Sequence, residues 1–512
     1  MNPKIRRQLI AGKQRIEKRL DKTKLGDVSQ PVLSAAVIKF EIAERARGVN
    51  YGGLGAMVLL VRRLGLAEAI DQRLHLLKIH LPYHESDHVL NLAYNALCDG
   101  RCLEDLELRR NDEVFLDALG ARRIPDPTTA GDFCRRFTEH HIRTLQDVFH
   151  ETRKKVWSEQ PAAFFGEARI DMDGTFVATD GECKQGMDIS YKGIWGYHPL
   201  VVSLANTGEV LSIVNRSANR PSHEGAADEV DRLLKVCFEG GFAKVRLRGD
   251  TDFSQTAHLD RWNADPRVRF IFGMDCMANL HILADDLPLA AWKPLKRPQR
   301  YRVKTKRRKR RANVKEAIVR EREFENIRLE SEEVAEFDYR PTACKQTYRM
   351  VVARKNVVHE KGELRLFDDY RYLFYITNDR DLSTTEIVFD ANDRCDQENL
   401  HAQLKGGVRS LTAPVDSLLS NWAYMVMASL AWNLKAWLAL SLPETGSDAE
   451  QRREEKRTVL RLEFRTFVNA LVRMPCQIVR TGRQLIYRLL NWNRWQAVLL
   501  RAVDALRHPL RC

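Results

Sequence analysis

The stretch Ala168-Arg-Ile-Asp-Met-Asp-Gly-Thr-Phe-Val177 decides the fold class of this chain. Its apolar and polar residues alternate, which is typical of a half-buried β-strand. Downstream, apolar runs and turn residues predict further strands at 200–205, 210–214, 244–248 and 268–272, and helices at 224–238 and 256–262. Three consecutive strands followed by alternating helices and strands predict an α/β core built on a mixed sheet.

The segments on either side of this core differ from it in character. Residues 53–152 carry apolar side chains at three-and-four spacing and are predicted to be helical, as is a basic segment at 1–25. Helices are expected to resume near Asp393 and to continue through Leu440. We therefore expect a helical N-terminal region, the first part of the core, a basic and β-rich insertion, the second part of the core, and a basic, partly helical C-terminal region, at 1–160, 161–292, 293–385, 386–442 and 443–512.

Length and charge restrict the class of protein. A chain of 512 residues is longer than one hydrophobic core supports, so two to four domains are expected. Lys and Arg number 83 against 69 Asp and Glu, a formal net charge of +14. Such an excess of positive charge favours an anionic partner, most often nucleic acid and next an anionic membrane surface.

A membrane span and a zinc site are both disfavoured. The most apolar stretch, Trp422 to Trp432, has 11 residues, which is too short to cross a bilayer and suits a buried helix. The N-terminus has no apolar signal-peptide core. Cys98 and Cys102 lie four apart, but no second pair completes a zinc site, and scattered thiols fit a reducing cytosol.

Acidic residues occur where the predicted strands end. Asp173 lies in the first strand, and Asp171 precedes it by two, so alternation places both on one face. Asp250 follows the strand at 244–248, at the end of an α/β strand where ligands usually bind. Each of these acids alone is more often a helix cap or a solvated turn residue. Several together would repel one another without a cation, so a cluster of them points to hard divalent metal ions.

A third acid, Glu398, lies in a predicted helix between two cations. Arg394 is four residues before it and Lys405 seven after it, so all three share one helical face. A carboxylate flanked by two cations can hold a metal ion while the cations contact phosphates. On local spacing alone, an exposed helix with an ordinary ion pair explains the pattern as well.

Taken together, these segments resemble the bacterial insertion-sequence transposases that have a DDE triad and a Tyr-x2-Arg-x3-Glu-x6-Lys signature. Arg394, Glu398 and Lys405 match the signature, and Asp173 and Asp250 match the first two acids. The resemblance runs from about residue 125 to beyond 480, and its further matching pieces are Gly196-Tyr-His-Pro-Leu200, Arg216-Ser-Ala-Asn219, Tyr375-Ile-Thr-Asn378 and Ala431-Trp-Asn433-Leu. The signature's Tyr position holds Ala391, which puts in doubt how the DNA flank is gripped.

The resemblance implies an RNase H-like mixed-sheet core with a β-rich insertion before the third acid. It implies that Asp173, Asp250 and Glu398 ligate two Mg²⁺ ions, with Mn²⁺ as a substitute. Asp171 is kept as an alternative first acid, and Asp252 is a near neighbour of the second.

The resemblance also implies the reaction and its partners. The expected activity is metal-dependent cutting of double-stranded DNA at terminal inverted repeats, followed by joining of the 3′-OH ends to target DNA. A homodimer in the synaptic complex and a cytoplasmic, nucleoid-associated location are expected. The alternatives are a transposase-derived DNA-binding protein without activity, and another RNase H-like nuclease, because a fold alone does not specify function.

Several residues are candidates for contact with DNA. Arg394 and Lys405 are expected to contact phosphates near the scissile bond, which fixes register rather than reading sequence. A basic run is expected to contact the DNA backbone in a salt-dependent way, with a solvated loop as the ordinary alternative; it comprises Lys304, Lys306, Arg307, Arg308, Lys309, Arg310 and Arg311. Trp195, Trp262 and Trp292 are candidates for stacking on a flipped base, although a buried core Trp is commoner.

Overall fold

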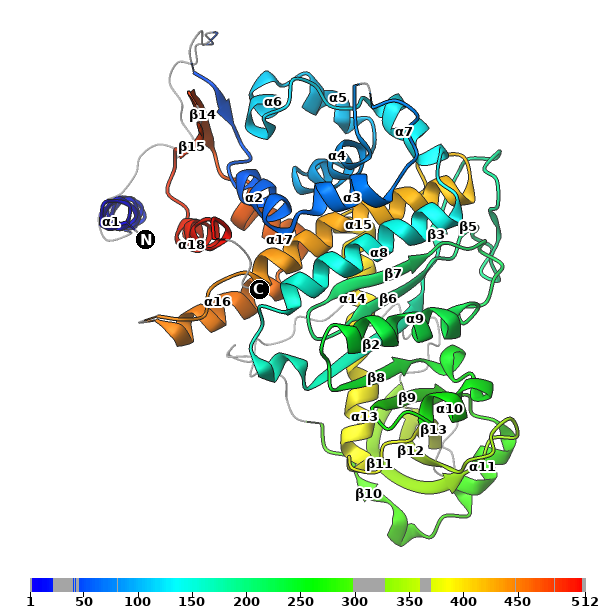
Figure 1. The fold of residues 1–512 in the computed structure, drawn as a ribbon. Coiled ribbons are helices and arrows are strands. Elements are labelled where there is room, and N and C mark those ends of the chain that lie inside the picture. Colours follow the sequence, from blue (N-terminus) through cyan, green and yellow to red (C-terminus); the bar gives the residue numbers. More distant parts are fainter. Residues whose placement is uncertain are drawn as a thin grey trace, which may run out of the picture.

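The computed structural model describes residues 2–21, 40, 42, 46–80, 82–297, 327–359, 370–446, 448–482 and 484–508. A nine-stranded mixed sheet runs through the body of the protein in the order β10-β11-β12-β13-β9-β8-β2-β6-β7 (Figure 1). Its strands are β2 (Glu167–Gly174), β6 (Leu200–Leu204), β7 (Glu209–Val214), β8 (Lys244–Gly249), β9 (Val268–Met274), β10 (Lys293–Pro294), β11 (Ile327–Tyr339), β12 (Tyr348–His359) and β13 (Tyr370–Thr377).

The centre of this sheet is the predicted α/β core. Strands β2, β6 and β7 pair antiparallel, and β8 and β9 are added parallel to β2. The helix α9 (Ala226–Glu239) connects β7 to β8, and α10 (Thr256–Asn263) connects β8 to β9. The expected order of strands and helices is therefore confirmed, and so is the mixed α/β class with an RNase H-like arrangement.

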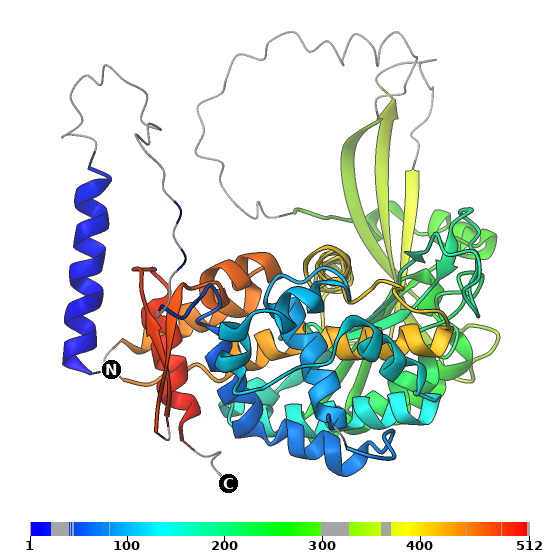
Figure 2. The same cartoon turned by 90° about the horizontal axis from the view of Figure 1, so that it is seen from above.

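The β-rich segment after the first part of the core extends the same sheet. Strand β13 pairs antiparallel with β9, and β12 and β11 follow outward as long antiparallel neighbours. Figure 2 shows these three strands rising together from the body of the protein. The strand character expected here is confirmed, and the strands are hydrogen-bonded to the core rather than packed as a separate sheet.

The helices of the N-terminal region lie together on the β7 side of the sheet (Figure 1). They are α2 (Leu54–Leu64), α3 (Leu66–Arg73), α4 (Glu85–Leu97), α5 (Asp105–Arg110), α6 (Glu113–Leu119), α7 (Pro127–Arg135) and α8 (Glu139–Trp157). The basic helix expected at the start is α1 (Pro3–Arg19). The helical interpretation of 53–152 is therefore confirmed.

The C-terminal region contains a hairpin that was not expected. After α16 (Ala449–Arg461) and α17 (Phe464–Phe467), strands β14 (Cys476–Thr481) and β15 (Gln484–Leu489) pair antiparallel before α18 (Gln496–Leu506). The short strand β1 (Gly48–Val49) pairs with β14. The segment just before α2 is thus joined to the C-terminal region through one small sheet.

The apolar stretch around Trp422 forms the central helix α15 (Leu418–Leu440), as expected for a buried helix. All of its residues from 420 to 440 are buried, between α4 and α8 on one side and β7 on the other. None of the described helices is both long and apolar enough to cross a membrane.

The outer edge of the sheet at β7 is sealed by side chains from these helices. Asn433 of α15 accepts a hydrogen bond from the Val210 amide at 2.9 Å and donates one to the Val210 carbonyl at 3.0 Å. Gln146 of α8 accepts from the Ile213 amide at 3.0 Å. An edge strand otherwise exposes unpaired backbone groups, and here they are satisfied inside the protein.

A buried glutamate ties the same three elements together. Glu209 at the start of β7 is fully buried, and its carboxylate accepts hydrogen bonds from the indole N–H of Trp157 at 3.0 Å and of Trp437 at 2.7 Å. The Thr207 hydroxyl donates a third bond at 2.7 Å. One carboxylate therefore joins α8, α15 and the sheet.

We predict that Glu209→Ala lowers the free energy of unfolding by about 3 kcal/mol or more, because two buried indoles and a hydroxyl lose their acceptor. Glu209→Gln is expected to lose less, since one amide oxygen still accepts. Denaturant unfolding measures both variants. The control Glu239→Ala removes an exposed glutamate paired with Lys154 and should change stability by no more than about 0.5 kcal/mol. A loss equal to the control's would contradict the anchoring role of Glu209.

Candidate active site

The three predicted acids come from three segments that meet at one end of the central strands. Asp173 lies near the end of β2, and Asp250 is the first residue after β8. These strands are parallel neighbours in which Asp171 is paired with Arg248. Asp173 lies two residues after Asp171, and Asp250 lies two residues after Arg248, so the two acids lie side by side. Glu398 comes from a helix that approaches the same sheet end.

The two aspartates share one cation. The Arg394 Nη1 atom lies 3.9 Å from Oδ2 of Asp173 and 3.9 Å from Oδ2 of Asp250. Asp250 also accepts a hydrogen bond from the Asp252 amide at 3.1 Å, which orients its side chain. Arg394 is therefore the counter-ion of both acids in the protein without metal.

The environment of these acids makes their negative charges costly. The pKa of Asp173 is raised to about 7, mainly by burial and also by the nearby charges of Asp250 and Glu398, while Arg394 opposes the rise. Burial also raises the pKa of Asp250, again against the effect of Arg394. Carboxylates that are both crowded and desolvated favour either a proton or an additional cation.

The donor chemistry of this cluster fits a hard divalent cation. Two aspartate carboxylates face one guanidinium, and a third carboxylate is close enough to act electrostatically on Asp173. Among the described residues, no three His, Cys, Asp or Glu side chains converge in positions that would hold one metal ion. The Arg394 guanidinium lies between the two aspartates, and the side chain of Glu398 is exposed.

The helical part of the site differs from the expected continuous helix. Helix α13 (Thr384–Asp393) begins nine residues earlier than expected, because Ser383 and Glu386 form a capping box. The helix is interrupted at Arg394. The next helix, α14 (Asp396–Ala402), carries Glu398, and residues 403–407 after it form a π-helical turn. The expectation that helices start near Asp393 and run on to Leu440 is therefore wrong.

The π-helical turn sets the place of Lys405. A π-turn advances the chain by more residues per turn than an α-helix, so spacing counted at 3.6 residues per turn no longer applies there. Lys405 nevertheless lies on the side of Asp173, whose negative charge raises its pKa against the larger lowering effect of burial. Arg394 and Lys405 thus lie on either side of the acids along this segment.

Asp171, the alternative first acid, is already engaged. Its side chain is almost fully buried, and Arg248 donates to both of its oxygens, with Nε–Oδ1 at 2.7 Å and Nη2–Oδ2 at 2.9 Å. Nη1 of Arg248 continues to Asp390 of α13, 2.6 Å from Oδ1. This buried network, Asp171–Arg248–Asp390, connects β2, β8 and α13 two to four residues before Asp173, Asp250 and Arg394. Sequence reasoning missed Arg248 and Asp390, because neither their pairing nor their burial has a local signal.

Two histidines beside Asp173 were also missed. His401 of α14 has Nδ1 3.8 Å from Oδ2 of Asp173, and its buried Nε2 has no hydrogen-bond partner among the described residues. Burial lowers the pKa of His401 to about 3, helped by the nearby Lys405 and Arg394, so the ring is neutral. Its spacing of three residues from Glu398 is a signal that could have identified it.

His198 approaches the same strand from the other side. Its Nδ1 donates to the Arg220 carbonyl at 2.9 Å, which leaves Nε2 facing the chain next to Asp173. A Cβ atom at Gly174 would lie 2.7 Å from that Nε2, so only glycine leaves room for the ring. Gly174 is therefore required for the close approach of His198 to the end of β2.

Ala391, which stands where the signature has Tyr, lies near a tyrosine from another element. Ala391 of α13 packs on a small apolar cluster to which Tyr375 of β13 also belongs. Burial raises the pKa of the Tyr375 phenol, while Arg297 and Arg394 oppose that rise. A phenol from another element thus lies close to the Arg394 guanidinium.

The remaining predicted DNA contacts fall into two groups. The basic run Lys304, Lys306, Arg307, Arg308, Lys309, Arg310 and Arg311 lies outside the described residues. Of the three tryptophans, Trp262 and Trp292 are buried at 3% and 7% exposure, whereas Trp195 is 53% exposed. Only Trp195 among them has a ring face that a base can reach.

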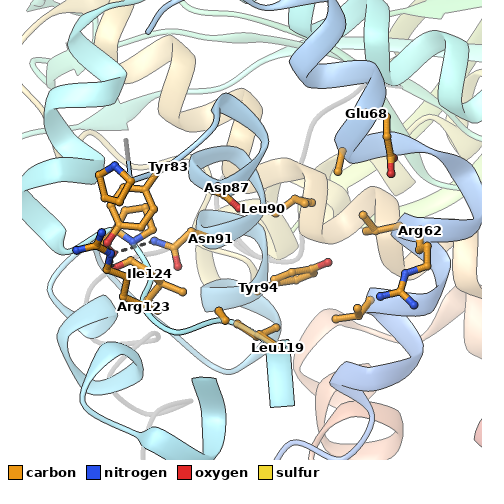
Figure 3. Close-up of a pocket in the computed structure, with 16 residues that line it drawn as sticks. Arg62, Glu68, Tyr83, Asp87, Leu90, Asn91, Tyr94, Leu119, Arg123 and Ile124 are labelled. Atoms are coloured by element: carbon orange, nitrogen blue, oxygen red, sulfur yellow. Dashed lines mark hydrogen bonds between the residues drawn. The ribbon is translucent and has the colours of Figure 1, made fainter. Parts of the chain in front are cut away.

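A separate cavity lies in the helical N-terminal region, away from the acids. It has a volume of about 400 Å³ and is enclosed by α2, α3, α4 and the segment around Ile124. Figure 3 shows Tyr94 and Leu90 projecting from α4 toward Arg62 on the opposite wall. Asn91 at its edge donates to the Pro125 carbonyl at 3.0 Å. None of the three acids lines this cavity.

Comparison with known proteins places the chain in a family. Its residues 46–510 match the family described as Transposase DDE domain group 1. The chain belongs to this family. The matched residues of this DDE transposase family member include the three acids, helices α2 to α8 and the C-terminal hairpin. The DDE and transposition features inferred from the sequence are thereby confirmed at the level of the family.

Two further comparisons complete the picture. No curated protein matches this transposase family member. Among solved structures, the cryo-EM structure of a piggyBac transposase synaptic complex with hairpin DNA is 10% identical, with 83% of each chain covered and a TM-score of 0.36.

We predict that the network through Arg248 is essential for stability. Arg248→Ala leaves the buried Asp171 without its partner and leaves Asp390 with Arg246 alone, so it should lower the free energy of unfolding by about 3–5 kcal/mol. Arg248→Lys keeps the charge but loses the bidentate hydrogen bonding to Asp171, so a smaller decrease in the free energy of unfolding is expected. Denaturant unfolding measures both, with Arg267→Ala, an exposed arginine paired with Asp265, as the control. Equal losses for Arg248→Ala and Arg267→Ala would rule out this role.

We also predict a pH-dependent effect of the crowded acids on the metal-free protein. Asp173 ionises near its ordinary pKa of 3.8 when unfolded but near 7 when folded, so folding stability falls as pH rises between these values. Asp250→Asn removes a negative charge that raises the pKa of Asp173. This variant should have a melting temperature about 2 °C higher than wild type at about pH 8 in EDTA.

At about pH 5 this difference should shrink, because Asp173 then keeps its proton in both proteins. A saturating divalent cation should reverse the order, since it stabilises the wild-type native state more. A lower melting temperature for Asp250→Asn in EDTA at the higher pH would show that the acids do not repel one another.

Proposed function

We propose that this chain is a DNA transposase of a bacterial insertion sequence that cuts DNA at terminal inverted repeats and joins the 3′-OH ends to target DNA. The observation that carries this proposal is the pair Asp173 and Asp250. They lie at the ends of neighbouring parallel strands, each 3.9 Å from the same Arg394 nitrogen, with the charge of Glu398 acting on Asp173. Membership of the DDE transposase family supports it.

In this proposal Asp173, Asp250 and Glu398 hold two Mg²⁺ ions, for which Mn²⁺ substitutes. Bound metal ions of this kind activate an attacking oxygen and stabilise the oxygen that leaves. The part played by the protein is to hold three carboxylates on rigid elements. The two aspartates lie at the ends of sheet strands, and Glu398 lies on a helix whose neighbour α13 is tied to the sheet by Asp390.

The cations beside the acids position the DNA. Arg394, which lies beside both aspartates, would be available to phosphate once the carboxylates held metal ions, because its guanidinium binds either kind of oxygen anion. Lys405 is half-buried, so its ammonium interacts more strongly with a phosphate than an exposed lysine does. The neutral rings of His401 and His198 keep further positive charge away from Asp173.

Two displacements at phosphorus account for the activity. In the first, a water molecule loses a proton as its oxygen forms a bond to phosphorus, the bond from phosphorus to O3′ breaks, and the released O3′ takes a proton to become the 3′-OH. In the second, this 3′ oxygen loses its proton to solvent and attacks a target phosphorus, while the target's own O3′ leaves. Each step exchanges one phosphorus–oxygen bond for another, so no oxidant is required.

The partners follow from the same reaction. Double-stranded DNA supplies both the repeat ends and the target, and we expect a homodimer to hold two ends together. We propose that the basic run from Lys304 to Arg311 contacts the DNA backbone. Affinity should then fall steeply with salt, because each neutralised phosphate releases condensed counterions.

The test is cleavage of a duplex that carries the repeat end and its flank, with Mg²⁺ present. Asp250→Asn and Glu398→Gln are each expected to lower cleavage more than about a hundredfold while DNA binding is retained, because each removes a charged metal ligand. The matched control is Asp252→Asn, an exposed acid two residues from Asp250 that should stay within a few-fold of wild type.

The outcomes separate the alternatives. DNA binding without Mg²⁺-dependent cleavage by the wild type would indicate a protein that has lost its activity. Cleavage without strand joining, or without preference for repeat ends, would indicate another nuclease. Cleavage by Asp250→Asn or Glu398→Gln close to the wild-type rate would contradict the assignment of the acids.

A further inference from the structure

Helix α14 carries a histidine one turn after the third acid. His401 is three residues beyond Glu398, and side chains at this spacing are neighbours on the surface of a helix. The side chain of His401 is only 9% exposed, so it lies inside the site, whereas that of Glu398 is exposed. The pattern Glu-x-x-His on a helix is one in which both side chains can bind the same group of metal ions.

The ring of His401 lies beside the first acid at a distance that suits two ligands of one ion. Its Nδ1 is 3.8 Å from Oδ2 of Asp173. An imidazole nitrogen and a carboxylate oxygen each bind a small divalent ion at about 2.0–2.2 Å, so two such atoms on one ion lie at most about 4.3 Å apart. The observed distance is within this limit, and one ion can therefore reach both atoms as they stand.

The protein itself does not satisfy the polar atoms of this ring. The contact of Nδ1 with Asp173 is longer than a hydrogen bond, and the buried Nε2 has no hydrogen-bond partner among the described residues. Buried polar side chains normally have partners, and one without them points to a further group at the site. A neutral imidazole has one nitrogen with a free lone pair, which is the atom that binds a metal ion.

His198, the other ring near Asp173, is held in a different way. Its Nδ1 donates to the Arg220 carbonyl at 2.9 Å. Its Nε2 faces the main chain, because a Cβ atom at Gly174 would lie 2.7 Å from it. The surrounding chain therefore fixes the His198 ring against the backbone of β2. Of the two rings, His401 is the one whose nitrogen has a carboxylate oxygen of the site as its neighbour.

A nitrogen donor changes which ions such a site prefers. Mg²⁺ takes oxygen ligands and keeps several of its waters, so it gains little from an imidazole. First-row transition ions accept imidazole nitrogen more readily. A site that adds one imidazole to carboxylates should therefore bind Mn²⁺ more tightly than Mg²⁺, and the difference should depend on the imidazole.

We propose that His401 is a fourth protein ligand of the metal site and binds, through Nδ1, the ion that Asp173 also binds. The three acids alone would give a site made of oxygen ligands. His401 adds a nitrogen to it and makes the position beside β2 selective for Mn²⁺ over Mg²⁺. This inference rests on the proposed function, because it requires metal ions at the acids.

The test is Mn²⁺ binding by the full-length protein, produced without a histidine tag and measured without DNA. Electron spin-echo spectroscopy of bound Mn²⁺ detects nitrogen nuclei that are directly attached to the ion. Labelling histidine alone with ¹⁵N changes the frequencies of such a signal only if the nitrogen belongs to a histidine. We expect a histidine nitrogen on Mn²⁺ in the wild type. This measurement requires no substitution, so it does not depend on the folding of any variant.

Substitutions then assign the nitrogen to one ring. His401→Ala and His401→Phe, which fills the space, should each lose the nitrogen signal and lower Mn²⁺ affinity about tenfold or more. Mg²⁺ affinity should change less than about twofold, because water replaces the ring. His198→Gln should keep the signal. The control His140→Ala removes an exposed histidine of α8 and should leave the signal and both affinities unchanged.

Other outcomes overturn the inference. Bound Mn²⁺ without a histidine nitrogen would refute it and leave the proposed function intact. Loss of the signal in His198→Gln, but not in the two His401 variants, would assign the ligand to the other ring. Equal weakening of Mn²⁺ and Mg²⁺ binding by the His401 variants would show a merely structural role. Absence of Mn²⁺ binding by the wild type would also refute the inference, and the cleavage assay with repeat ends then decides whether the proposed function fails with it.

Discussion

The geometry of the candidate site depends on the buried arginine Arg248 and the two carboxylates it connects. Arg248 donates to both oxygens of Asp171 and to Asp390, and all three side chains are buried. Each lies two to four residues before a residue of the site, so the network sets the spacing of β2, β8 and α13. Burying these charges is costly, and the cost is offset only while all partners stay in place.

This network also explains why two aspartates of the same strand have different properties. Asp171 and Asp173 are only two residues apart, yet both oxygens of Asp171 accept hydrogen bonds from Arg248. Asp173 shares Arg394 with Asp250 and lies within the field of Glu398, so its pKa is raised to about 7. The first carboxylate is a structural ion pair, and the second remains available for a further cation.

The wider fold keeps this end of the sheet in place. Helix α15 and helix α8 seal the β7 edge, and Glu209 joins both helices to the sheet through two indoles. On the opposite side, β13 continues the sheet beyond β9. The central strands therefore have neighbours on both sides, which leaves their ends as the place where polar side chains gather.

Local patterns in the sequence predicted the strands and helices of the core, the buried helix α15 and the candidate acids, because alternation, three-and-four spacing and strand-end acids are properties of short segments. They did not predict the Arg248 network, the C-terminal hairpin, the start of α13 or the exposure of Trp195 against Trp262 and Trp292. These features depend on contacts between residues far apart in the chain. Arg248 and Asp390 are separated by 142 positions, and no periodicity connects them. Which carboxylate is hydrogen-bonded to a buried arginine and which is not depends on how the strands pack, and burial exists only after they have assembled.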